Sequence, residues 1–253
     1  MRTLTKVVFL AVVIAVISTA CVVPARLRVI RGSGDVIVED RDVSGFDRIS
    51  ISGAGKIILT QGDRESLTIE TDDNLMEYIE TRVVGDTLEI DFTDEIVLSP
   101  GGRDVLEPSD GFIFRISVID LEAIKVSGAA DIQTGKLKTD RLVITFSGAG
   151  DISINDLNAD TLEVYISGAG NVDLAGKVLY QYVTLSGVGR YAGFGLESQE
   201  ASVTISGVGG ADVWATETLD VVISGAGDVE YYGDPSVHPE ISGLGRLNGR
   251  GEK

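Results

Sequence analysis

The sequence predicts an all-β protein: a right-handed parallel β-solenoid, or β-helix, with coils of about 20 residues. Two observations carry this prediction. A Ser-Gly-x-Gly motif recurs at nearly constant intervals, and apolar residues alternate with other residues on both sides of each copy. Helical patterns are nearly absent, and NLMEYIETRV, from Asn74, is the best candidate for a single short helix. We expect roughly ten coils, right-handed because parallel crossovers almost always are.

The motif is most regular in the second half of the chain. Its opening serine falls at Ser127, Ser147, Ser167, Ser186, Ser206, Ser224 and Ser242. The intervals between these serines are 20, 20, 19, 20, 18 and 18 residues. An earlier copy begins at Ile51, and a weaker one lies near Gly32. Spacing of this kind is typical of solenoids, in which equivalent residues of successive coils stack about 4.8 Å apart.

Each repeat has the pattern of strands with one buried face. In TLEVYISGAGNVDL, Leu162, Val164 and Ile166 alternate with other residues before the glycines, and Val172 and Leu174 do so after them. Side chains of a strand point alternately to opposite faces, so these residues are predicted to form the core. Glycine suits the corner between the strands because it accepts positive φ and leaves room for the backbone of the next coil.

The first twenty residues have the pattern of a secretory leader. Arg2 and Lys6 precede the apolar run 7–17, and small residues then lead to Cys21, the only cysteine. A cysteine directly after such a leader is typical of bacterial lipoproteins. We therefore predict that Cys21 is lipidated and that the chain is attached to a membrane through its N-terminus only. Ordinary cleavage and a retained leader anchor are the alternatives.

The rest of the chain is predicted to form a tether, residues 21–29, and a single domain, residues 30–250. The domain begins with coils over 30–60, is irregular up to residue 126, and is regular over 127–245. The segment TDEIVLSPGGRDVLEPSDG, from Thr93, is too irregular for a coil and is expected to be a projecting loop. Further strands are expected near 67–71, 87–92 and 112–118.

Composition excludes some partners. The chain has 21 Lys and Arg against 39 Asp and Glu, which gives a net charge of −18. Such a charge repels phosphate backbones, so nucleic acid is not expected as a partner. With 43% hydrophobic residues, the chain can still bury a sizeable core. One cysteine allows no disulfide within the chain, so the fold must depend on packing and hydrogen bonds.

The sequence offers little for catalysis or cofactors. Gly-x-Gly loops bind dinucleotides where a helix follows them, and here a strand pattern follows. The single histidine, His238, lies between two prolines in what we predict to be a rigid turn, so histidine-based catalytic and zinc sites are excluded or poor. We predict a protein that is not an enzyme and has no cofactor. A polysaccharide-active solenoid enzyme is the rival hypothesis, because carboxylates are abundant.

Aligning the coils produces one candidate metal site. The position after the second glycine holds Asp131, Asp151 and Asn171 in successive coils. Carboxylate and amide oxygens bind hard cations such as calcium, so the row could hold a weak metal site. Arg190, one coil further, could neutralise the row instead. A solvated row with no calcium requirement is the outcome that we predict.

The same alignment produces a candidate binding surface on the outward side of the strands before the motif. One column reads Thr145, Tyr165, Thr184, Thr204 and Val222. Its neighbour reads Val143, Glu163, Tyr182, Ser202 and Asp220. Tyr165 and Tyr182 could bind a glycan or a protein, because tyrosine offers an apolar ring and a hydroxyl. Tyrosine and threonine are also good strand residues, so a purely structural role is the alternative.

Three stretches carry a family resemblance: VSGFDRISISGAGKIILTQGDRESLTIETDDNLMEYIETRVVGDTLEI, the repeated SGAG coils, and YYGDPSVHPEISGLGRL. Through them, about residues 30–250 resemble the putative auto-transporter adhesin head domains, called GIN domains, of bacterial envelope proteins. The resemblance implies a β-solenoid at the bacterial surface or in the envelope, with no catalytic residues to assign. We expect an exported, membrane-anchored lipoprotein that acts as a non-catalytic adhesin-like module. Its partner would be a glycan or a surface protein; an envelope spacer without a ligand is the alternative.

Overall fold

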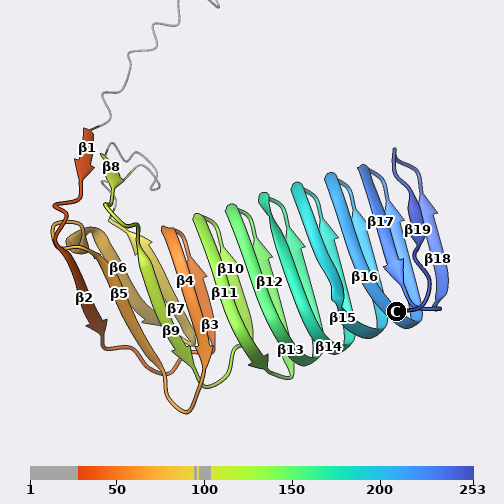
Figure 1. The fold of residues 1–253 in the computed structure, drawn as a ribbon, viewed down its shortest axis with the longest axis horizontal. Coiled ribbons are helices and arrows are strands. Elements are labelled where there is room, and N and C mark those ends of the chain that lie inside the picture. The colour runs from red at the N-terminus through yellow and green to blue at the C-terminus, as the bar shows by residue number, and fades with distance from the viewer. Residues whose placement is uncertain (1–27, 94–95, 97–103) are drawn as a thin grey trace, which may run out of the picture.

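The computed structural model describes residues 28–93, 96 and 104–253, and most of these residues lie in β-strands. Figure 1 shows successive coils stacked into one elongated body, with β1 and β8 projecting from its side near the N-terminal end. The coils are parallel, about 20 residues apart, and make about six turns. The predicted solenoid with coils of this length is confirmed. The expectation of roughly ten coils is wrong, because much of the N-terminal part does not coil.

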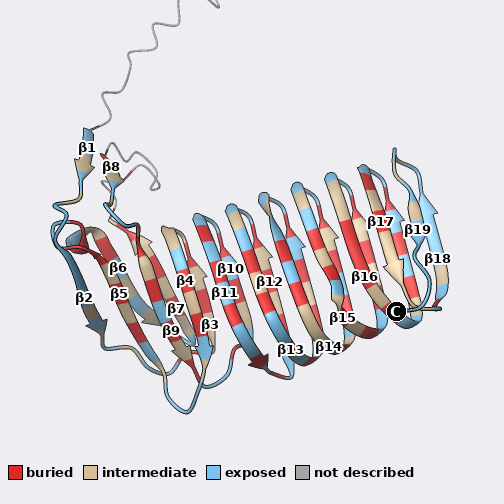
Figure 2. Cartoon of the chain, in the orientation of Figure 1, coloured by how far each residue is buried: buried red, intermediate tan, exposed pale blue. Residues whose placement is uncertain are grey.

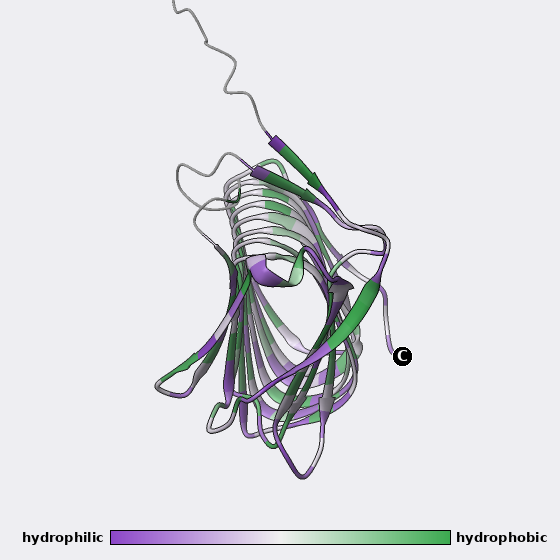
Figure 3. Ribbon diagram, turned by 90° about the vertical axis from the view of Figure 1, so that its left-hand side faces the viewer, coloured by the Kyte–Doolittle hydropathy of each residue, from purple (hydrophilic) through white to green (hydrophobic). Residues whose placement is uncertain are grey.

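The regular array is made of strands that pair in parallel with their equivalents in the next coil. The strands that open and close it are β10 (Ala123–Val126), β11 (Ala129–Lys138), β12 (Arg141–Phe146), β17 (Ala226–Tyr232), β18 (Ser236–Ile241) and β19 (Leu247–Gly249). The long strands between them each follow most of one coil: β13 (Ala149–Ile166), β14 (Ala169–Leu185), β15 (Val188–Ile205) and β16 (Val208–Ile223). Seen along the stack in Figure 3, equivalent strands lie behind one another.

The N-terminal part contains both solenoid strands and antiparallel pairs. Its strands are β1 (Arg28–Arg31), β2 (Val36–Arg41), β3 (Arg48–Ile51), β4 (Ala54–Gln61), β5 (Ser66–Asp72), β6 (Ile79–Val84), β7 (Thr87–Phe92), β8 (Asp104–Glu107) and β9 (Ile113–Val118). β3 and β4 pair in parallel with β10 and β11. β2 and β9 pair antiparallel with β5, and β6 with β7. The weak motif copy near Gly32 therefore does not open a coil, and coiling within residues 30–60 begins only at β3.

Three local expectations need correction. The expected helix from Asn74 is a single 3-10 turn, η1 (Met76–Tyr78), because the residues after it pair as β6 with β7. The expected loop over 93–111 contains β8, which pairs in parallel with β1; residues 94–95 and 97–103 lie outside the described part. The expected turn at His238 is wrong, because this residue lies in β18, which pairs with β16.

The core fills the interior of the coils. Figure 2 shows buried and exposed residues alternating along the strands. The five residues predicted to point inward are all at most 1% exposed: Leu162, Val164, Ile166, Val172 and Leu174. Burial of these columns removes apolar surface from water in every coil, which is the main stabilising contribution expected for such a stack.

The glycines of the motif are explained by crowding at the corner. A Cβ atom added to Gly168 would lie 2.1 Å from the carbonyl oxygen of Gly148, and one added to Gly148 would lie 1.8 Å from that of Gly128. These three glycines do not have positive φ, whereas Gly150 and Gly209 do, at 121° and 155°. The first glycine of the motif is therefore required because the preceding coil lies too close for a Cβ atom. In some coils the second glycine of the motif also has a positive φ.

Differences in coil length are accommodated away from this corner. The pairing register shifts between Ile154 and Leu157, between Asp173 and Ala175, and between Ala192 and Glu197. The motif itself stays in register through the same coils. The extra or missing residues are accommodated at these register shifts, so the pairing at the corner is unchanged while the interval varies.

Candidate binding surfaces

The predicted columns of the tyrosine surface are confirmed by the strand register. Glu163 pairs with Tyr182, and Tyr165 pairs with Thr184, between neighbouring coils. Tyr165 is 41% exposed and Tyr182 is 45% exposed. We call the outward surface of Glu163, Tyr165, Tyr182, Thr184 and Ser202 the tyrosine face. It contains a shallow hollow of about 370 Å³.

Glu163 fixes one side of the tyrosine face. Its Oε1 accepts hydrogen bonds from Nη2 and Nε of Arg141, at 2.7 and 3.0 Å. Its Oε2 accepts one from the hydroxyl of Tyr165, at 2.8 Å. The bonds from Arg141 lower the pKa of Glu163, so the carboxylate remains charged at neutral pH. The hydrogen bond to Glu163 raises the pKa of Tyr165, so the hydroxyl remains a donor.

The two tyrosines differ in how they are held. Tyr165 is oriented by Glu163, whereas the hydroxyl of Tyr182 has no hydrogen-bond partner within the described residues. Both belong to paired strands of the stack. The tyrosine face therefore offers one fixed ring, one free hydroxyl and a charged carboxylate, a combination that suits a ligand with both apolar and hydroxyl groups.

The candidate metal row lies in neighbouring coils as predicted, but its oxygens have other partners. Oδ1 of Asp131 accepts the backbone N–H of Asp151 at 2.9 Å. Oδ1 of Asp151 accepts the backbone N–H and the side-chain amide of Asn171, at 3.2 and 2.8 Å. These donors relieve the repulsion between the carboxylates without a cation. In the described ranges, no group of three or more His, Cys, Asp or Glu side chains is arranged to hold a metal ion.

Two further sequence expectations can be placed. Arg190 does not neutralise the aspartate row; it pairs with Asp212. Nδ1 of His238 lies 3.1 Å from Oδ1 of Asp220, and both side chains are exposed. Cys21 and the leader lie outside the described residues, so lipidation stays a prediction. None of the helices that the structure describes is long and apolar enough to span a membrane.

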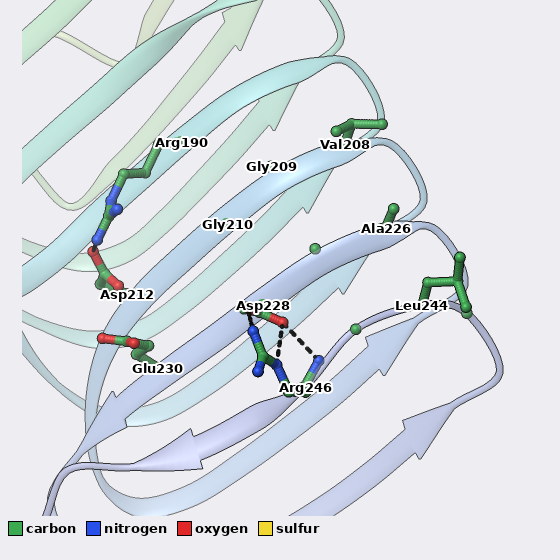
Figure 4. A pocket seen from close by; sticks show the side chains of 13 residues that line it. Arg190, Val208, Gly209, Gly210, Asp212, Ala226, Asp228, Glu230, Leu244 and Arg246 are labelled. Carbon is green, nitrogen blue, oxygen red and sulfur yellow. Dashed lines mark hydrogen bonds and ion pairs between the residues drawn. The ribbon is translucent and has the colours of Figure 1, made fainter.

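Sequence reasoning missed a larger hollow, of about 890 Å³, over the last coils (Figure 4). It lies where the column of Asp131, Asp151 and Asn171 continues to Arg190 and then to Gly210. The signal for this hollow in the sequence is Gly210, a glycine in a column that otherwise holds polar side chains. The charged residues around it are Arg190, Asp212, Asp228, Glu230 and Arg246.

The family model described as "Putative auto-transporter adhesin, head GIN domain" matches residues 45–235. No curated protein matches the chain. A putative adhesin from Bacteroides fragilis has a similar solved structure, with a TM-score of 0.81 and 26% sequence identity. That similarity covers 87% of this chain and 99% of the other.

Two solved structures from Parabacteroides support the fold alone. A protein from P. distasonis, described as a putative lipid binding protein, has a TM-score of 0.66 and 23% identity, over 88% of this chain and 99% of the other. A putative adhesin from P. merdae has a TM-score of 0.64 and 22% identity, over the same shares.

Proposed function

The chain belongs to the family of putative auto-transporter adhesin head GIN domains, and from this membership we propose that it is an exported protein of the cell envelope that binds a glycan without catalysis. The family and the similar protein from Bacteroides fragilis are named as adhesins rather than enzymes. We place the glycan on the tyrosine face. The net charge of −18 favours a neutral or cationic partner over a polyanion.

The observation that carries this proposal is the exposure of Tyr165 and Tyr182 on neighbouring coils, beside the carboxylate of Glu163. Large aromatic rings in a solvent-exposed position can cover the apolar C–H face of a sugar. The carboxylate of Glu163 can accept hydrogen bonds from sugar hydroxyls, and the tyrosine hydroxyls can both donate and accept. Tyr165 is already held by Glu163, so ordering it on binding costs little conformational entropy.

Glycan binding can be tested with the full chain on an array of oligosaccharides, followed by titration of the bound compounds. Replacing both tyrosines, Tyr165→Ser with Tyr182→Ser, should weaken binding about tenfold or more, which corresponds to about 1.4 kcal/mol. The matched control is Val222→Ser, because Val222 is exposed in the same column but does not line the hollow. Circular dichroism should be unchanged, since none of these side chains points inward.

The results separate the alternatives. If no glycan binds the chain, or if the affinity survives the double substitution, the tyrosine face is not a glycan site. Release of reducing ends from a bound polysaccharide would instead support the enzyme hypothesis. A chain that binds neither a glycan nor an envelope protein would support the spacer hypothesis.

Attachment to the membrane is a separate part of the proposal. It depends on the sequence before Cys21, where a charged and an apolar region are followed by small residues. Mass spectrometry of the native protein should find an N-terminal, lipidated cysteine. A retained leader or an unmodified N-terminus would contradict lipidation. The leader would then be either a retained anchor or removed by ordinary cleavage.

A further inference from the structure

The larger hollow exists because one side chain is missing from a column. Asn171, Arg190, Gly210 and Asp228 occupy equivalent positions in four successive coils, and Arg246 follows in the last one. Figure 4 shows Gly210 between the side chains of its neighbours. We call the space of about 890 Å³ around it the Gly210 hollow.

Coil packing does not require this glycine. A Cβ added to the neighbouring Gly209 would lie 1.9 Å from the carbonyl oxygen of Gly189, which no side chain can tolerate. A Cβ added to Gly210 would have the carbonyl oxygen of Asp228 as its nearest neighbour, at 3.2 Å, and its φ is not positive. A small shift of the neighbouring backbone would accommodate it. The packing of the coils at the corner therefore does not explain why residue 210 is a glycine.

The charges around the hollow compensate one another. Arg190 pairs with Asp212, which is only 6% exposed. Nη2 of Arg246 lies 2.9 Å from Oδ2 of Asp228. Arg250, just outside the hollow, pairs with Glu230. Since each carboxylate has its own guanidinium, the hollow offers no unpaired charge to an ionic ligand.

The pairs still offer hydrogen bonds. A guanidinium has five N–H donors, and Arg190 and Arg246 use part of them for Asp212 and Asp228. Carboxylate oxygens likewise accept more than one hydrogen bond. The hollow thus places donors and acceptors side by side, which suits neutral groups that both donate and accept, such as hydroxyls.

The opposite rim of the hollow is apolar. It consists of Val208, Ala226 and Leu244, the residues between the two glycines of the motif in the last three coils. Val208 is 55% exposed and Leu244 is 87% exposed. A ligand that fits this space therefore has one apolar side and one side rich in hydroxyls, which is the chemistry of a sugar ring.

We propose that the Gly210 hollow binds a neutral saccharide unit, as a second site separate from the tyrosine face. The backbone at Gly209 and Gly210 carries no side chain, so a ligand can approach the main chain closely. The two sites use strands on opposite sides of the motif corner, since the tyrosines precede the glycines and Gly210 follows them. A substitution can therefore abolish binding at one site without affecting the other.

The test fills the hollow. Gly210→Asn introduces the residue that the same column holds at Asn171, so the backbone position should accept it. The matched control is Gly135→Asn, because Gly135 is exposed, has nothing within 4 Å of an added Cβ, and does not line the hollow. The probes are neutral hexose and N-acetylhexosamine oligosaccharides and their uronate and amine counterparts, titrated against the full chain.

We expect at least one neutral oligosaccharide to bind, with affinity reduced tenfold or more by Gly210→Asn and unchanged by Gly135→Asn. Leu244→Ser should weaken the same binding about threefold through loss of the apolar rim. Substituting Tyr165 and Tyr182 by serine should leave binding at this site intact.

Several results would overturn the proposal. These are no binding of any neutral probe, preferential binding of a charged counterpart, or full affinity in the Gly210→Asn variant. If the tyrosine variant loses all binding and Gly210→Asn loses none, the glycan binds at the tyrosine face. If Gly210→Asn does not fold, the affinity of Leu244→Ser is the test, because this exposed side chain can be changed without affecting the core. Unchanged affinity in that variant would overturn the proposal.

Discussion

The regular array, β10 to β19, and the N-terminal part, β1 to β9, are stabilised in different ways. In the array, every coil repeats nearly the same contacts with its neighbours. In the N-terminal part, β2, β5, β6, β7 and β9 form antiparallel pairs that occur once each. The stability of an array is approximately a sum of similar terms between neighbours, whereas a single contact has no substitute. A substitution in the N-terminal part can remove a contact that occurs once, whereas one at the corner of the array disturbs two neighbouring coils at the same time.

One set of contacts that occurs once in the N-terminal part is made by Asp72, which is fully buried. Its Oδ1 accepts the backbone N–H of Gly34 and the hydroxyl of Ser109, and its Oδ2 accepts the backbone N–H of Ser109, each at 2.8 Å. The three residues lie far apart in the sequence. Asp72 therefore joins the start of the domain, the end of β5 and the segment after β8.

The largest effect is expected at the crowded corner of the array. Gly168→Ala would place a Cβ 2.1 Å from the carbonyl oxygen of Gly148, so the backbone of two coils must separate. We expect a loss of about 3 kcal/mol or more in the free energy of unfolding, measured by chemical denaturation. Gly135→Ala, where an added Cβ meets nothing within 4 Å, should change it by about 0.5 kcal/mol or less. Equal effects of the two substitutions would contradict the crowding argument.

A smaller loss, of about 2–3 kcal/mol, is expected for Asp72→Asn, because an amide nitrogen replaces one of the two buried carboxylate oxygens that accept these hydrogen bonds. Asp63→Asn, at an exposed turn, is the control and should have little effect. If the N-terminal part unfolds separately from the array, the substitution should lower only one of two transitions. A single transition that Asp72→Asn lowers as a whole would show that the two parts unfold together.

The same residue predicts a pH dependence. The hydrogen bonds from Ser109 and Gly34 lower the pKa of Asp72 below its ordinary value. Because the folded pKa lies below the unfolded pKa of about 3.9, this contribution is complete above that pH and is lost as the pH falls through the folded pKa. Thermal midpoints measured from pH 7 to pH 2 should therefore fall more steeply for the native chain than for Asp72→Asn.

Tyr191→Phe tests a contact within the array that is not repeated. The hydroxyl of Tyr191, which is fully buried, donates to Oε1 of Gln181 at 3.0 Å, and Nε2 of Gln181 donates to Ser198 at 2.6 Å. Removing the hydroxyl leaves a buried acceptor unpaired, so we expect a loss of about 1–2 kcal/mol. Tyr180→Phe, on the surface, should be nearly neutral. No change in the Tyr191 variant would mean that water satisfies Gln181.

The smallest effect is expected from chelation of metal ions. Asp131 and Asp151 already accept hydrogen bonds from the next coil, so EDTA should leave the thermal midpoint unchanged at constant ionic strength. Asp151→Ala should cost about 1 kcal/mol through lost hydrogen bonds, with or without calcium. A midpoint that falls in EDTA, recovers with calcium, and does so only when Asp151 is present would establish a metal site.

The sequence predicted the array well because its information is repeated. Alternation identified the buried residues Leu162 and Val164, and aligning the coils placed Tyr165 and Tyr182 in adjacent columns. Buried Gln181 lies at a position where the other coils have leucine, alanine or valine, a departure that is visible in the alignment. Its partners are not visible, because they depend on side-chain packing inside the coil.

The N-terminal part could not be predicted in the same way. The pairing of β5 with β9 and the role of Asp72 depend on tertiary contacts between distant segments, which leave no periodic signal. The Gly210 hollow was missed for another reason. The motif explains its own glycines by their place at the corner, and Gly210 follows the motif. Gly210 leaves a hollow because its neighbours in the adjacent coils, Arg190 and Asp228, have long or charged side chains and it has none.

The parallel stacking of the coils also sets the reach of the molecule. Each coil adds about 4.8 Å to the stack, so inserting or removing a coil between the ends would change the length in equal steps. The Gly210 hollow lies in the last coils, and the described chain enters at the opposite end (Figure 1). A chain held by its N-terminus would therefore present this hollow at its tip, at a distance from the attachment point set by the number of coils.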